Sequence, residues 1–158
     1  MAKKLTRKRG AVAEAKEVAA KLSPRDKKTM TSIVGLADGV VVAAEKRRDP
    51  HVDIPSRTLS NVRYSPRKRI LEMGNSTNRR QLFDLSQAKA YMRTMLVASG
   101  CKKLLTQGKT TSLRGMYYML KHTIEGTKEN TFDDQSESDT VIEDIEVLLA
   151  SLREELHL

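Results

Sequence analysis

The spacing of apolar side chains changes twice along this chain, and this change constrains the fold more than any other feature. Over residues 30–44 apolar residues recur at helical spacing, which predicts a helix from residue 23 to about residue 46. Over residues 51–83 short alternating segments, separated by turns rich in Pro, Gly and Asn, predict strands instead. The helical spacing then returns. The pattern predicts a mainly α-helical α+β fold with a small β-hairpin.

The predicted hairpin region is strongly basic. Strands are expected over residues 52–55, 58–64 and 69–73, with a further short strand over 80–83. The region contains six cations that are candidate DNA contacts: Arg63, Arg67, Lys68, Arg69, Arg79 and Arg80. A basic hairpin beside helices is typical of the wing of a winged-helix DNA-binding domain.

Two successive helices are predicted after the hairpin. The first runs from about Ser86 to Gly108, and the second from Ser112 to about Thr123. A short turn with Lys109 connects them, and Lys109 is a further candidate phosphate contact. Helix, short Gly-containing turn and helix form the helix-turn-helix pattern, in which the later helix is the candidate recognition helix.

The sequence suggests three regions. Residues 1–22 are a basic arm followed by an Ala-rich, helix-prone segment, residues 23–126 are the winged-helix domain, and residues 127–158 are an acidic loop and a C-terminal helix. The last helix is expected to start near residues 136–139. Its narrow apolar stripe is suited to a helical partner and consists of Val141, Ile145, Leu148, Leu149, Leu152 and Leu156.

Charge is divided unevenly between these regions. Residues 1–122 carry 27 Lys and Arg against 9 Asp and Glu, whereas residues 123–158 carry 2 against 11. The basic part favours a polyanionic partner, with nucleic acid as the first candidate and an anionic membrane surface as the second. The acidic part is expected to face a partner or to shield the chain's own cations.

Other features exclude whole classes of protein. A single cysteine, Cys101, excludes a disulfide framework and a cysteine-based zinc site, and we expect it to be a small buried hydrophobic residue. The longest apolar run, residues 33–44, is interrupted by Asp38 and is too short to span a bilayer. No membrane partner is expected. A soluble intracellular protein, cytoplasmic and nucleoid-associated, is the expectation.

The predicted second helix places two adjacent tyrosines in different surroundings. Successive residues of a helix turn by about 100°. Tyr117 therefore falls on the apolar stripe, whereas Tyr118 falls on the neighbouring polar stripe between Arg114 and Lys121. Cations one turn before and one turn after Tyr118 would favour the phenolate form and attract a phosphodiester.

This arrangement allows two interpretations. Tyr118 is either a nucleophile that attacks DNA phosphorus, or part of a DNA-binding helix whose tyrosine hydroxyl only donates a hydrogen bond to phosphate. The spacing alone leaves both open.

Residues 114–118 read Arg-Gly-Met-Tyr-Tyr, which resembles the Arg-x-x-(Tyr/Phe)-Tyr motif of the A subunit of type IIB DNA topoisomerases (topoisomerase VI) and their meiotic double-strand-break relatives. The resemblance extends over about residues 50–158 and includes segments 60–64, 97–99, 121–123, 129–139 and 152–158. It implies a winged-helix, CAP-like domain in which Tyr118 attacks the scissile phosphate to form a 5′-phosphotyrosyl link. It also implies that Arg114 stabilises the transition state, and that two protomers act as a homodimer on double-stranded DNA.

The resemblance carries expectations about cofactors and partners too. In the family a Toprim domain follows and supplies the acidic residues that hold Mg²⁺, and this chain stops where that domain would begin. Mg²⁺ is therefore expected for cleavage, with no ligands in this chain and a metal site from a Toprim-bearing chain. ATP is expected only through a GHKL-type ATPase B subunit, because the sequence has no Gly-rich phosphate loop. Gly115 stands where the family often has an acidic residue.

Three hypotheses follow. The chain is a DNA-cleaving tyrosine module, a non-catalytic winged-helix DNA-binding protein derived from this family, or a structural protein that acts through its last helix. The four carboxylates within residues 133–139 are expected to cap that helix rather than to bind a metal ion.

Overall fold

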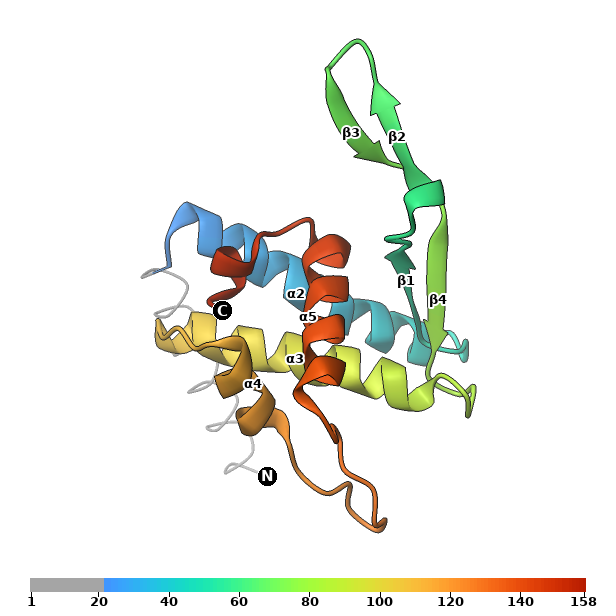
Figure 1. The fold of residues 1–158 in the computed structure, drawn as a ribbon. Helices are drawn as coiled ribbons and strands as arrows, with labels where there is room; N and C mark the ends of the chain where they lie inside the picture. Colours follow the sequence, from blue (N-terminus) through green and yellow to red (C-terminus); the bar gives the residue numbers. More distant parts are fainter. Residues whose placement is uncertain (1–21) are drawn as a thin grey trace.

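The computed structural model describes residues 22–158 (Figure 1). The expected basic arm and Ala-rich segment therefore lie almost wholly outside the described residues. The described elements, in chain order, are α2 (Pro24–Glu45), β1 (His51–Pro55), η1 (Leu59–Asn61), β2 (Val62–Ser65), β3 (Ile70–Met73), β4 (Thr77–Gln81), α3 (Ala88–Gln107), α4 (Leu113–Leu120), α5 (Gln135–Leu149) and η2 (Arg153–Leu156).

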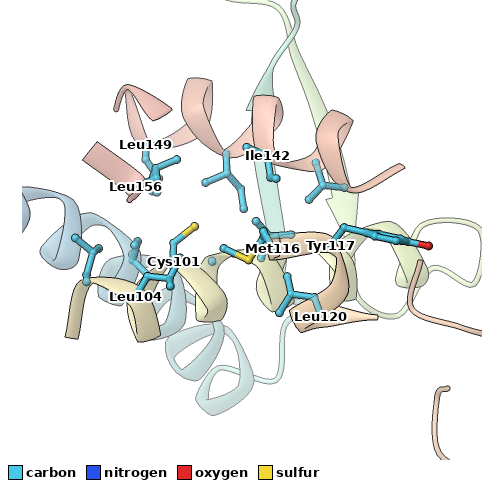
Figure 2. Close-up of a cluster of buried hydrophobic side chains, with 14 of the residues drawn as sticks. Cys101, Leu104, Met116, Tyr117, Leu120, Ile142, Leu149 and Leu156 are labelled. Carbon is cyan, nitrogen blue, oxygen red and sulfur yellow. The ribbon is translucent and has the colours of Figure 1, made fainter. Parts of the chain in front are cut away.

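The helices enclose one main core. Figure 1 shows α3 running between α2, α4 and α5, and the side chains that fill the space are almost all aliphatic. Figure 2 shows Cys101 of α3, Met116 of α4 and Ile142 of α5 meeting there. Cys101 is fully buried, as predicted, and burial raises the pKa of its thiol to about 12. The thiol therefore acts as a small hydrophobic group in the core.

The starts and stops of the helices follow local capping signals. The Ser23 side chain accepts a hydrogen bond from the Asp26 N–H at 3.1 Å, which caps the start of α2. Ser112 caps α4 in the same way, through the Gly115 N–H at 3.1 Å. Gly108 ends α3 in the left-handed conformation, with φ of 61°. These predicted boundaries are confirmed.

The predicted hairpin is a two-part antiparallel ribbon. Strands β1 and β4 pair at its base, from His51 opposite Gln81, and β2 and β3 pair at its tip, from Val62 opposite Met73. Figure 1 shows the base beside the helices and the tip extending away from them. Two sequence boundaries were wrong: the strand expected over 58–64 begins as the 3₁₀ turn η1, and the last strand spans 77–81 instead of 80–83.

Asn61 joins the two parts of the ribbon. Its side-chain amide donates to the Ser56 carbonyl at 2.8 Å and to the Ser76 carbonyl at 3.1 Å, and its Oδ1 accepts from the Ser76 N–H at 3.0 Å. The buried Asn61 side chain thus adds to the backbone hydrogen bonds at the junction where β1–β4 and β2–β3 separate.

The C-terminal region differs most from the prediction. Helix α5 ends at Leu149 because Ala150 takes up a left-handed conformation with φ of 48°, so the helix does not continue through Leu152 and Leu156. Leu152 is exposed, whereas Leu156 on η2 is fully buried. The apolar stripe of α5 lies in this chain's own core, so it is not a free surface for a helical partner.

Ion pairs connect the acidic helix α5 to the ribbon base. Arg57 pairs with Glu143 and, at 3.0 Å, with Asp144. Arg80 of β4 pairs with Asp144 and donates to the Thr94 hydroxyl of α3 at 2.7 Å. The acidic segment therefore neutralises cations of the same chain. The structure confirms the predicted α+β class with a winged-helix-like arrangement.

None of the helices within residues 22–158 combines the length and the apolar character needed to cross a lipid bilayer.

Candidate active site and nucleic-acid interface

Helix α4 places Tyr118 on the surface and Tyr117 at the edge of the core. Tyr117 is 7% exposed and Tyr118 is 61% exposed, which confirms the prediction from helical spacing. The buried face of α4 rests on α3, where Gly100 allows the Met116 side chain to approach closely. Figure 2 shows the Tyr117 ring leaving the core with its hydroxyl outermost. The packing of α4 therefore fixes the direction in which Tyr118 projects.

Two neighbours contact the Tyr118 ring. The Arg114 guanidinium lies 5.9 Å from its centroid, within the range of a cation–π interaction. The Tyr117 ring lies 5.1 Å away, tilted by 56°. These contacts keep one permanent positive charge beside the ring, while the phenol itself stays largely exposed.

Lys121 does not flank Tyr118, and this part of the prediction was wrong. Its amine lies 5.0 Å from the Tyr117 ring centroid and donates to the Tyr117 hydroxyl at 2.6 Å. This hydrogen bond raises the pKa of the Lys121 amine. The cause is the early end of α4: the helix stops at Leu120, three residues before the predicted end, and Lys121 has extended backbone angles. Lys121 therefore leaves the helical stripe that it was expected to share with Tyr118.

The segment after α4 folds back and holds the end of the helix. The Thr131 hydroxyl donates to the Leu120 carbonyl at 2.8 Å, and Arg93 of α3 donates to the Thr131 carbonyl at 2.6 Å. The Tyr117 hydroxyl donates to the Asp133 carbonyl at 2.9 Å. Sequence reasoning missed these residues because their partners lie up to 38 positions apart. The polar segment between α4 and α5 also lacks the regular spacing of apolar residues that predicts a helix or a strand.

Of the four carboxylates expected to cap the start of α5, Glu137 accepts a backbone hydrogen bond there, whereas Asp134 at the N-cap position makes no side-chain capping hydrogen bond. Glu137 accepts hydrogen bonds from Arg93 and from the Asp133 N–H, both at 2.8 Å. Burial alone would raise the pKa of the Glu137 carboxyl, but these hydrogen bonds outweigh burial and lower it. Across residues 22–158 no group of three or more His, Cys, Asp or Glu side chains is arranged to hold a metal ion. The described residues thus do not fit a Mg²⁺ site.

The structure separates the candidate DNA-binding cations into two surfaces. The ribbon tip carries four exposed cations, namely Arg63, Arg67, Lys68 and Arg69. Lys109 is exposed in the turn before α4. Figure 1 shows the ribbon tip and α4 at opposite ends of the molecule. The tip is therefore too far from Tyr118 to contact the same phosphate.

Three of the candidate cations on the ribbon form ion pairs within the fold, and one of them, Lys68, pairs with Glu72 at 2.7 Å near the tip. Arg79 donates to both carboxylate oxygens of Asp53, at 2.7 and 2.9 Å, across the ribbon base. Its hydrogen bonds hold the pKa of the Asp53 carboxyl below the usual range. Arg80 is largely buried and paired with Asp144. Arg80 stabilises the attachment of the ribbon, and its charge is not free for phosphate.

Comparison with known proteins relates this geometry to one family. The family model described as Type IIB DNA topoisomerase matches residues 89–158, which include Arg114 and Tyr118. The chain is 39% identical to the A subunit of type 2 DNA topoisomerase 6 from Pyrococcus horikoshii over 138 residues, which are 87% of this chain and 36% of that protein.

Two further relatives have the same name. The protein of Saccharolobus shibatae is 43% identical over 121 residues, which are 70% of this chain and 31% of that protein. The protein of Methanothermobacter thermautotrophicus is 35% identical over 129 residues, which are 82% of this chain and 35% of that protein. The chain thus spans about a third of the length of these relatives. It belongs to the type IIB DNA topoisomerase family, with A subunits of topoisomerase 6 as its relatives.

Proposed function

We propose that this chain is the DNA-binding and DNA-cleaving tyrosine module of a type IIB topoisomerase. The observation that carries the proposal is Tyr118: an exposed phenol on a helix packed into the core, with the Arg114 guanidinium against its ring, inside the segment that matches the family. An exposed tyrosine on a firmly packed helix, beside a permanent cation, suits attack on a phosphodiester.

In this reaction the Tyr118 oxygen attacks phosphorus and the bond from phosphorus to the 3′ oxygen breaks. The phenol loses its proton, the departing 3′ oxygen gains one, and the DNA 5′ end remains attached to Tyr118. Arg114 has guanidinium N–H groups that are able to donate to the non-bridging phosphate oxygens, where negative charge develops in the transition state. The Lys121 amine donates a hydrogen bond to the Tyr117 hydroxyl. Lys121 therefore affects Tyr118 only by holding the neighbouring Tyr117 side chain in place.

The proposal includes partners. Cleavage of both strands of double-stranded DNA needs two tyrosines and hence a homodimer. Mg²⁺ would help to activate the phosphate and the leaving group, and its ligands must come from a Toprim-bearing part outside the described residues. ATP would act through a GHKL-type ATPase B subunit.

Formation of a covalent protein–DNA adduct tests the proposal. End-labelled duplex DNA is incubated with the chain and Mg²⁺ or Mn²⁺, alone and together with a Toprim-bearing partner and the ATPase, and denaturant-resistant adducts are counted. We expect an adduct that Tyr118→Phe abolishes while the affinity for DNA changes by less than about twofold, because the hydroxyl is exposed and its loss leaves the fold intact. Tyr117→Phe is the matched control and is expected to keep the adduct.

An adduct that persists in Tyr118→Phe would show that another group is the nucleophile. No adduct under any condition, with DNA binding retained, would favour the second candidate function: a non-catalytic DNA-binding protein derived from this family. The observation that favours this candidate is the set of exposed arginines at the ribbon tip, Arg63, Arg67 and Arg69, which can bind phosphate without any reaction at Tyr118.

A further inference from the structure

One face of the β2–β3 ribbon is apolar and exposed. In the antiparallel register Tyr64 lies opposite Leu71, and Val62 lies opposite Met73. Directly opposed residues, and residues two positions apart, share one face of a ribbon. Tyr64, Leu71 and Met73 therefore lie on the same face, where they are 60%, 71% and 43% exposed. Exposed apolar side chains that cluster in this way mark a binding surface.

The charges around this face indicate the kind of partner. Arg63, Arg67 and Arg69 are exposed and form no ion pair with any residue from 22 to 158, and Glu72 is the one acid on these strands. A stable protein interface buries roughly 800 Å² on each side, far more than a few side chains on a two-stranded ribbon present. Arg67 and Arg69 lie in the turn at the end of the apolar face, whereas Arg63 lies opposite Glu72 on the other face of the ribbon. An apolar face bordered by free arginines fits a polyanion with apolar groups in its interior, which describes duplex DNA.

We propose that the β2–β3 ribbon enters the major groove of duplex DNA and places Tyr64 and Leu71 against thymine methyl groups. The major groove admits a two-stranded β-ribbon, and thymine is the one base that presents a methyl group there. Arg67 and Arg69 at the tip contact the phosphates beside the groove. The hydrogen bonds of Asn61 fix the direction of the tip relative to the ribbon base. This inference shares one assumption with the proposed function, namely that the chain binds duplex DNA.

The experiment compares two duplexes that differ only in these methyl groups. One contains thymine and the other contains uracil at every thymine position, and binding of the chain is measured without divalent metal. We expect the uracil duplex to bind about fourfold more weakly for each methyl group covered. Leu71→Ser combined with Tyr64→Ser is expected to bind both duplexes equally, whereas Tyr64→Phe keeps the ring and the preference. Leu85→Ser is the matched control, because Leu85 is almost fully exposed outside the ribbon.

Equal binding of the two duplexes by the parent chain would overturn the inference. A preference for thymine that persists in the double variant would also overturn it. If the double variant changes the sedimentation of the chain and not its DNA binding, the apolar face meets a second copy of the chain instead. Because no cleavage is needed, a failed adduct experiment leaves this result unaffected, and the two proposals are tested separately.

Discussion

At the scale of single residues, Arg114 and Lys121 contribute differently to the candidate site although both lie within one turn of Tyr118. Arg114 lies against the Tyr118 ring, whereas the Lys121 amine donates to the Tyr117 hydroxyl and to the Asp133 carbonyl. We expect Arg114→Ala to slow adduct formation by about 100-fold or more, as loss of a group that stabilises a developing anion does. Lys121→Ala is expected to slow it by less than about tenfold. Rates of adduct formation at saturating DNA measure both effects.

Arg114→Lys provides the control at this site, because it keeps the charge and loses the planar guanidinium. An intermediate rate for this variant is expected. Equal losses in Arg114→Ala and Lys121→Ala would show that Lys121 moves to Tyr118 when DNA binds, contrary to its hydrogen bonds in this structure.

At the scale of elements, the contact between α3 and α4 sets the position of the site. A Cβ atom at Gly100 would lie 2.9 Å from the Met116 sulfur, and Met116 is fully buried, so the core would have to move. We expect Gly100→Ala to lower the free energy of unfolding by about 1–3 kcal/mol. Gly35→Ala in α2 is the matched control: a Cβ atom there meets nothing within 4 Å. It is expected to raise the free energy of unfolding by about 0.5–1 kcal/mol. Urea unfolding followed by circular dichroism measures both, and destabilisation by Gly35→Ala would contradict this account of α2.

The boundaries of the helices show which structural features can be predicted from the sequence. Helix starts and stops at Ser23, Gly108 and Ser112 could be predicted because each cap forms within three or four residues of its partner. The same is true of the exposed position of Tyr118, which depends only on helical spacing. The ends of α4 and α5 could not be predicted. They depend on the returning segment at Thr131 and on a left-handed alanine at position 150, and neither has a local sequence signal.

At the scale of the whole molecule, charge pairing over long distances decides which cations are free. Arg80 was predicted to bind DNA, but its partner Asp144 is 64 residues further along the chain, and no sequence period relates the two. The acidic helix α5 therefore neutralises the ribbon base and leaves the tip positive. Exposed cations with no ion pair to a described residue also lie on the helices, among them Lys27 and Lys28 of α2 and Lys102 and Lys103 of α3, so the tip is one of several positive surfaces.

The salt dependence of DNA binding tests this division. Each phosphate contact contributes about 0.9 to the slope of log affinity against log salt concentration. Arg67→Gln and Arg69→Gln are each expected to reduce the slope by about this amount with no change in stability, because both side chains are exposed. Arg80→Gln is expected to leave the slope unchanged.

Arg80→Gln should instead lower the free energy of unfolding by about 1–3 kcal/mol. The reason is that the buried Asp144 carboxylate would keep Arg57 as its one cationic partner among the described residues. A smaller slope in Arg80→Gln, without loss of stability, would show that Arg80 leaves Asp144 to bind phosphate. The ribbon base would then belong to the DNA-binding surface together with its tip.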